Sequence, residues 1–389
     1  MSEMDVCFIN YTPYGSQGNT NMFKLSQALV SRVESVTVVG IDPRRLSGDM
    51  ISCDVNGVLV NKIPIERDVH STTLLKFCNR VIDVIDSGHF DVIHIFSFRG
   101  ASIIPLIARR RGIYDRSTWI YQIIQVSFNK EWWRYFLSNQ VTKFESDLFH
   151  ATISSSDIIL QEIFGQQPNS SDNRYVIPLG VDMNRFCPDP QLRTQKRDQL
   201  GFNDDDLVFI SVGSMNKERD LEALVHGFAG VEKRNGMSIR LMFVGDGEDR
   251  SNLEDLVVTL EIDDVVEFLG EVPFSVVPEY LVAADVGISH ISEATPQRIQ
   301  PPLKVGEYLA SGLPVMATCT SGNKLYIDDG YNGIMYMSSV ESVTNAFLEM
   351  LEPEYLKQIR SNARESVRPF ETDKLTEDLI QIYRGLVTT

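Results

Sequence analysis

Residues 301–315 read PPLKVGEYLASGLPV, which predicts a short helix followed by a strand. Pro302 suits the first helical turn, and Gly312 is placed to end the helix. The free N–H groups of that turn, with the Lys304 side chain beside them, would form a site for a diphosphate. Glu307 follows one turn later, where its carboxylate could accept hydrogen bonds from two neighbouring ribose hydroxyls. For an isolated lysine and glutamate, however, an ordinary amphipathic surface is the more common explanation.

The pairing of strand and helix recurs along the whole chain. Apolar strand-like runs alternate with helical patterns, which is typical of parallel sheets covered by helices. A second series of these units begins at residue 207, after a stretch at 186–206 that we interpret as a linker. The predicted strands cover residues 6–10, 36–39, 92–95, 119–124, 151–154, 207–213, 241–244, 265–269, 286–289 and 315–318. The sequence therefore predicts an α/β protein with two Rossmann-like parallel-sheet domains facing a cleft, where ligands bind beyond the carboxyl ends of the strands.

Size and composition fit a two-domain globular protein. At 389 residues, the chain exceeds the size at which a single hydrophobic core keeps growing. No segment approaches the about 20 consecutive apolar residues of a spanning helix, and the first residues lack the pattern of a signal peptide. A net charge of −17 argues against nucleic acid as a general partner. The five cysteines are scattered, without a Cys-x-x-Cys pair, so we expect reduced thiols and a cytoplasmic location.

Four further stretches accompany residues 301–315 in a fixed order, namely 176–182, 243–248, 268–272 and 280–286. Together the five stretches resemble the retaining glycosyltransferases of family 4, particularly the members with a Pro-x-Lys-x-x-Glu-Tyr donor helix. The resemblance extends over nearly the whole chain. It implies the two-domain GT-B fold, a UDP-, GDP- or other nucleotide diphosphate sugar as donor, and transfer with retention of configuration.

The resemblance also implies how the chain is divided. Residues 1–186 would form the N-terminal acceptor-side domain, and residues 187–370 the C-terminal domain that binds the donor. The last helix, within 371–389, would pack back on the N-terminal domain. Its apolar face consists of Leu375, Leu379, Ile382, Tyr383 and Leu386.

Several donor-binding residues follow from the same resemblance. Gly15 and Gly18 would bring a loop of the N-terminal domain to the donor phosphates, although an ordinary turn also explains them. Gly245 has an equally plausible structural explanation, in which it turns a strand into a helix. The family places the nucleotide base against the loop at Phe268 and Leu269. The donor helix would contribute Pro302, Leu303, Lys304 and Glu307.

The cations expected near the phosphates differ from the family pattern. Ser214 stands where an arginine is common, and Arg219 aligns with the usual lysine. We therefore expect Arg219 to act with Glu307 in catalysis, with Lys217 as a less favoured substitute. The first glutamate of the Glu-x7-Glu signature is replaced by Ile299, and Glu293 could replace it only through a longer loop.

A metal ion and a resident cofactor are not expected. No Asp-x-Asp follows a predicted strand, and the Asp204-Asp205-Asp206 run precedes one, which favours a solvated turn. Cations and a helix N-terminus can stabilise the leaving diphosphate instead.

On the acceptor side, two residues are candidates. His94 ends a strand that would lead into the cleft, but a hydrogen-bonded core histidine is favoured. Gln125, or Gln122 as the alternative, aligns with a histidine that many family members carry. Two other functions stay open, a GT-B-fold nucleotide-sugar epimerase and a non-catalytic glycosyltransferase-like subunit.

The acceptor itself could be a glycan, a lipid-linked molecule or a small molecule. A segment in the N-terminal half combines aromatic and basic residues in an otherwise acidic protein. Its members are Lys130, Trp132, Trp133, Arg134, Tyr135, Phe136 and Lys143. Such a helix could rest on an anionic membrane that carries a lipid-linked acceptor, at the inner face of the membrane. Packing of these aromatic residues in the core is the alternative.

Overall fold

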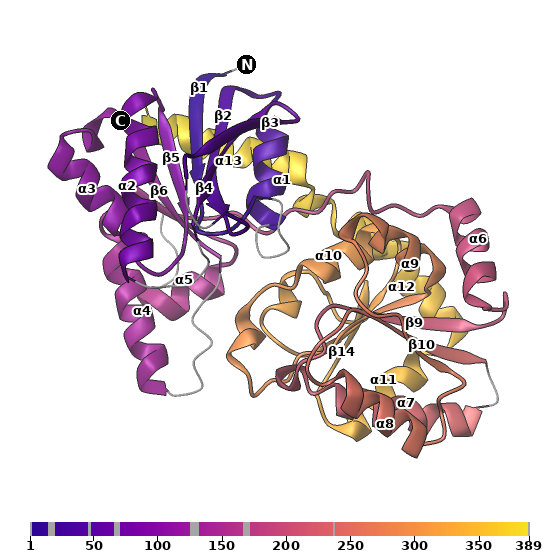
Figure 1. The fold of residues 1–389 in the computed structure, drawn as a ribbon. Helices are drawn as coiled ribbons and strands as arrows, with labels where there is room; N and C mark the ends of the chain where they lie inside the picture. Colours follow the sequence, from indigo (N-terminus) through magenta and orange to yellow (C-terminus); the bar gives the residue numbers. More distant parts are fainter. Residues whose placement is uncertain are drawn as a thin grey trace. The chain divides into compact units, whose positions relative to one another are not determined.

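The computed structural model describes residues 2–14, 20–45, 48–65, 71–124, 132–165, 172–235 and 238–387. The chain forms two compact units, each built around its own sheet (Figure 1). Unit 1 consists of Met1–Gly180 and Thr372–Thr389, and unit 2 consists of Val181–Glu371. The predicted α/β class with two Rossmann-like parallel-sheet domains is confirmed.

Unit 1 contains an eight-stranded sheet in the order β3-β4-β2-β1-β5-β6-β7-β8. All neighbouring strands are parallel except β3 and β4. That antiparallel pair, which the sequence analysis did not predict, turns at Asn56 and Gly57, both with positive φ. The strands are β1 Ser2–Ile9, β2 Val33–Asp42, β3 Ile51–Val55, β4 Val58–Pro64, β5 Val92–Phe96, β6 Thr118–Ile123, β7 Ala151–Ser154 and β8 Arg174–Val176.

Most helices of unit 1 lie between successive strands in the sequence, and α13 comes from the end of the chain. They are α1 Thr20–Leu29, α2 Ser71–Ser87, α3 Ile103–Arg111, α4 Trp132–Ser146, α5 Asp157–Phe164 and α13 Thr372–Val387. The last of these returns from the end of the chain to lie beside α1, and Figure 1 draws it in yellow against unit 1. Leu379 and Tyr383 of α13 are fully buried in the core of this unit, which fixes the helix there.

Unit 2 contains a six-stranded parallel sheet in the order β11-β10-β9-β12-β13-β14. Its strands are β9 Leu207–Val212, β10 Ile239–Val244, β11 Val266–Phe268, β12 Val286–Ser289, β13 Val315–Thr318 and β14 Gly333–Tyr336. Its helices are α6 Pro190–Leu200, α7 Leu221–Asn235, α8 Arg250–Thr259, α9 Val277–Ala283, α10 Leu303–Ala310, α11 Val340–Met350 and α12 Pro353–Ser366. Two separate hydrophobic clusters hold these elements together.

The boundary between the units lies earlier than the sequence suggested. The expected boundary followed residue 186, but Val181, Met183 and Phe186 are buried in a core cluster of unit 2. The expected linker at 186–206 mostly forms α6, because Asp189 caps its first turn by accepting hydrogen bonds from two main-chain N–H groups. Gly201, with φ of 70°, then ends the helix.

The acidic run at 204–206 is not simply a solvated turn. Asp206 is only 3% exposed, and its carboxylate accepts hydrogen bonds from Arg240 Nε at 2.9 Å and the Asn203 N–H at 2.7 Å. Ser238 also donates to this carboxylate. Asp206 is therefore a structural ion-pair partner, because a buried carboxylate needs such neighbours to remain charged.

Candidate functional site

The candidate site in unit 2 begins where β9 and β10 end. A Cβ atom on Gly245 would lie 2.1 Å from the carbonyl oxygen of Gly213, and both residues have φ near 130°. The main-chain N–H of Gly245 donates to the carbonyl of Gly270. The turn after β10 therefore also contacts the turn after β11. Close backbone packing therefore accounts for the glycine at 245. A direct contact between Gly245 and a donor stays a prediction.

The predicted donor helix α10 lies beside these turns, and no side chain caps its N-terminus. Pro302 precedes the helix as its N-cap and provides no side-chain hydrogen bond to the first turn, which begins at Leu303. The Tyr308 hydroxyl accepts a 2.7 Å hydrogen bond from the Val212 N–H, which fixes α10 against the end of β9. Gly287 makes room for the Tyr308 ring, because a Cβ there would lie 2.4 Å from it. The first turn of α10 is thus held next to the end of β9.

Two cations, Arg219 and Lys304, lie close to each other at this place. Arg219 ends the short 3₁₀ helix Lys217–Arg219, and its Nε donates to the Ser214 hydroxyl at 3.4 Å. Burial lowers the pKa of Lys304 well below its usual value, and the positive charge of Arg219 lowers it further. Burial lowers the pKa of Arg219 as well. Lys217, by contrast, is exposed.

Within the described residues, these two cations lack the counter-charge that such groups usually have. In the described part of the chain, neither Arg219 nor Lys304 forms an ion pair with a carboxylate. Half-buried like charges oppose each other, so their proximity costs free energy unless an anion joins them. Their arrangement beside a helix N-terminus therefore suits a phosphate group.

His290 also belongs to this site, although the sequence analysis did not identify it. It follows β12 directly, is fully buried, and places Nδ1 3.0 Å from the Tyr336 hydroxyl. Burial, followed by the charges of Lys304 and Arg219, lowers its pKa to about 3, so the ring is neutral at pH 7. Its place just after a strand was the signal that could have identified it.

Glu307 lies on the buried side of α10. Its side chain is 6% exposed, and it lies close enough to Tyr308 and Tyr326 to affect both phenols. Burial raises the pKa of each phenol, and the negative charge of Glu307 raises it further. That the Glu307 carboxylate accepts hydrogen bonds from ribose hydroxyls stays a prediction.

Both residues of the predicted base-binding loop contact the neighbouring strand β10. The Phe268 ring stacks on Phe243 with centroids 5.0 Å apart and an interplanar angle of 10°. The Leu269 N–H donates to the Phe243 carbonyl at 2.9 Å, so this N–H is not available to a nucleotide base. Any main-chain contact to a base must therefore come from other groups of the loop.

The altered Glu-x7-Glu signature has a structural explanation. Ile299 is 7% exposed at the end of the 3₁₀ helix Pro296–Ile299, so it packs as an apolar residue. The Glu293 carboxylate accepts hydrogen bonds from the Ser338 N–H at 3.2 Å and the Ser338 hydroxyl at 2.9 Å. In this structure Glu293 therefore holds the segment after β14.

In unit 1, two of the predicted acceptor-side residues can be examined: His94, and the alternative Gln122, which is 1% exposed and lies beside His94. Gly15, Gly18 and Gln125 lie outside the described residues. His94 is fully buried, and its Nδ1 lies 2.6 Å from the Tyr383 hydroxyl on α13. Burial lowers the pKa of His94 to about 3. These are the features of a core histidine, the alternative that the sequence favoured.

Comparison with known proteins gives the family of unit 2. Residues 193–366 match the family model described as Glycosyl transferases group 1. The match covers most of unit 2 and somewhat less than half of the whole chain. The predicted enzyme class, a glycosyltransferase, is thereby confirmed, and the match begins within α6 and ends with α12.

Two relatives match larger parts of the chain. The alpha-monoglucosyldiacylglycerol synthase of Acholeplasma laidlawii is 26% identical over 215 residues, which cover 54% of this chain and 52% of that protein. The putative glycosyltransferase EpsD of Bacillus subtilis (strain 168) is 24% identical over 330 residues, 82% of this chain and 83% of that protein. The chain thus aligns with about half the length of the first relative and most of the second.

Solved structures share the fold of this chain. A glycosyltransferase from Rickettsia africae ESF-5 superposes with a TM-score of 0.78 at 13% identity and 100% coverage of both chains. HepE from Anabaena, solved in complex with UDP-glucose, superposes with a TM-score of 0.74 at 16% identity, again covering 100% of both chains. At these identities the likeness shows the fold, which is the predicted GT-B architecture.

Proposed function

We propose that this glycosyltransferase moves a sugar from a nucleoside diphosphate sugar to an acceptor hydroxyl, with retention of configuration and without a metal ion. The carrying observation is the pair formed by Arg219 and Lys304 at the first turn of α10, since two half-buried cations that have no carboxylate partner among the described residues suit a diphosphate. The complex of HepE with UDP-glucose supports a nucleotide-sugar donor for this fold.

The proposed reaction requires stabilisation of a negative leaving group. The bond between the anomeric carbon and the diphosphate oxygen breaks, and the acceptor oxygen forms a bond to that carbon from the same face. The acceptor proton passes to the departing phosphate, so charge and protons balance. Arg219, Lys304 and the N–H groups of Leu303 and its neighbours strengthen their contacts as negative charge develops on the diphosphate. They supply the stabilisation that a metal ion provides in other enzymes.

The remaining predicted residues have supporting roles in this proposal. Glu307 orients the donor through its ribose hydroxyls, and the loop at Phe268 and Leu269 borders the base. The Ser214 hydroxyl accepts a hydrogen bond from Arg219 Nε and so holds the guanidinium in place. An arginine at position 214 has no acceptor atom in its side chain and could not make this contact.

A donor panel tests the proposed reaction. We expect release of nucleoside diphosphate from one UDP- or GDP-sugar to depend on an acceptor, and the rate to stay within about twofold after addition of EDTA. The anomeric configuration of the product, measured by NMR, should equal that of the donor. Release without net transfer would favour the epimerase or a hydrolase, and binding without release would favour the non-catalytic subunit. A rate that EDTA abolishes and Mn²⁺ restores would contradict the metal-free mechanism.

We also propose that α4 contacts an anionic membrane. Large apolar side chains on this helix are more than half exposed: Phe136 at 52%, Leu137 at 53%, Val141 at 54% and Phe144 at 63%. Arg134 and Lys143 are exposed on the same helix. The core-packing alternative does not hold for Phe136, and the side chains of Trp132, Trp133 and Tyr135 lie outside the described ones, as does Lys130. In the described ranges every helix is too short or too polar to pass through a bilayer, so the proposed contact is peripheral.

Liposome sedimentation tests this contact. We expect the chain to sediment with vesicles that contain phosphatidylglycerol at low salt, and to be released as salt rises. Phe144→Glu should reduce the bound fraction several-fold, because it places a charge on the apolar surface. Val258→Glu is the matched control, since Val258 is also 63% exposed but lies on α8 of unit 2. Equal sedimentation of both variants, or none of the parent protein, would remove α4 from the membrane proposal.

A further inference from the structure

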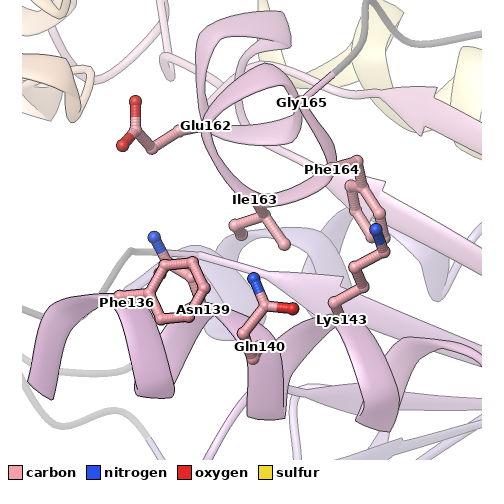
Figure 2. A pocket seen from close by; sticks show the side chains of 8 residues that line it. All are labelled: Phe136, Asn139, Gln140, Lys143, Glu162, Ile163, Phe164 and Gly165. Carbon is pink, nitrogen blue, oxygen red and sulfur yellow. The ribbon is translucent and has the colours of Figure 1, made fainter. Parts of the chain in front are cut away.

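A separate pocket lies in unit 1 between α4 and α5. Its volume is about 360 Å³, at the lower end of the range for pockets that hold small molecules. Asn139, Gln140 and Lys143 line it from α4, whereas Ile163 and Phe164 line it from α5 (Figure 2). None of these residues belongs to the elements that form the candidate donor site.

The Asn139 side chain gives the strongest indication that the pocket holds a ligand. It is only 6% exposed, and in the described part of unit 1 its amide has no hydrogen-bond partner. Figure 2 shows the amide of Gln140 pointing from α4 towards Ile163. The Asn139 amide is not fully closed off from solvent, so its donors and acceptor can pair with water or with a molecule that enters the pocket.

The mixture of polar groups indicates the class of that molecule. An amide offers both donors and acceptors, the Lys143 ammonium offers only donors, and the Glu162 carboxylate at the edge offers only acceptors. A phosphate would meet repulsion from Glu162, whereas hydroxyl groups both donate and accept and can therefore pair with all four side chains.

The apolar part of the lining completes the match. Ile163 and Phe164 are buried beneath the pocket, and Phe136 stands half exposed at its edge. An aromatic ring at the edge suits the apolar C–H face of a sugar ring, while the hydroxyls around that ring meet the amides. We propose that this pocket binds a hexose unit of a glycan, at a site separate from the one where the sugar is transferred.

The pocket also adjoins the exposed apolar residues of α4. Phe136 belongs to both, and Lys143 lies one position before Phe144 on the same helix. A hexose bound here would therefore lie close to the proposed membrane contact, although its binding does not depend on that contact. The pocket can consequently be tested with soluble sugars alone.

Saturation-transfer NMR on the full chain tests the proposal. The probes are methyl α-D-glucopyranoside and methyl β-D-galactopyranoside at about 10 mM, a concentration that detects binding with a Kd of about 1 mM, or about −4.1 kcal/mol. Saturating UDP is present to occupy a nucleotide site. We expect transfer to at least one hexoside in the parent protein and a roughly fivefold weaker affinity in Gln140→Ala.

Gln140→Trp fills the pocket from an exposed position and should abolish the signal, while acceptor-dependent release of nucleoside diphosphate continues. Gln358→Trp, at an exposed glutamine of α12, is the matched control and should keep the signal. No transfer to either hexoside, or equal transfer in the two tryptophan variants, would overturn the proposal. Displacement of the hexoside by glycerol phosphate would assign the pocket to an anion and would also overturn it. Absence of transferase activity in the parent protein would contradict the proposed function but not the proposed hexose site.

Discussion

Replacing Arg219 with alanine is expected to lower the rate of sugar transfer by about thirty- to thousandfold, which corresponds to about 2 to 4 kcal/mol of transition-state stabilisation. The guanidinium is half-buried beside Ser214 and contributes to the low pKa of Lys304, so the two cations act at one place. Its planar fork can hold two phosphate oxygens, and these contacts strengthen as the diphosphate leaves. Initial rates at saturating donor measure the effect.

Two comparison variants make the Arg219 result specific. Lys217→Ala removes an exposed cation in the same 3₁₀ helix, and we expect a much smaller loss of rate. Arg116→Ala removes an exposed arginine of unit 1 that pairs with Asp86, and it should leave the rate within about twofold. If Arg219→Ala stays within about twofold of the parent protein, Lys304 and the first turn of α10 are the only phosphate-binding groups left in the proposal.

Lys304→Met should affect activity and stability in opposite directions. Donor affinity and transfer rate should fall by about a hundredfold or more, because the variant loses a cation that contacts the diphosphate. The unliganded protein should become more stable by about 1 kcal/mol, since a half-buried ammonium beside Arg219 is replaced by an apolar side chain of similar length. Thermal unfolding without ligand, compared with donor binding, measures both effects.

The lowered pKa of Lys304 also sets the direction of a pH dependence. Because the pKa is lower in the folded chain than in the unfolded chain, the unfolded chain binds more protons between the two values. The contribution of Lys304 to stability therefore rises as pH rises through this window, while donor affinity falls as the ammonium loses its proton. Arg219→Ala should move the loss of affinity to higher pH, since it removes a neighbouring positive charge. The account would be contradicted if Lys304→Met showed the same pH dependence of stability and of donor affinity as the parent protein.

The sequence predicted the parts of the fold that depend on local patterns. The apolar runs gave ten of the strands, and the turn from α10 to β13 follows from Gly312, whose φ is 81°. The hairpin of β3 and β4 was missed although Asn56 and Gly57 are a common signal for such a turn. The early domain boundary could not be predicted, because it depends on Val181 and Phe186 joining a core whose other members are distant in sequence.

In the candidate site, too, the sequence predicted what depends on local patterns and missed what depends on residues distant in sequence. Residues 301–315 identified Lys304 and Glu307 because a helix N-terminus with a nearby cation is a local pattern. The role of Tyr308 in holding α10 to Val212 depends on a pair 96 residues apart, and no local pattern indicates it. The explanation for Gly245 likewise requires the carbonyl of Gly213, which only the packed turns bring close.

Calorimetric titration of the chain with UDP and GDP tests the central claim most directly, namely that Arg219 and Lys304 form the diphosphate site of a glycosyltransferase. We predict that one of the two nucleotides binds the parent protein, stabilises it by about 2.7 kcal/mol at 100 times its Kd, and binds Arg219→Ala and Lys304→Met far more weakly. Binding of equal strength in the parent protein and in both variants, or no binding of either nucleotide, would contradict the account.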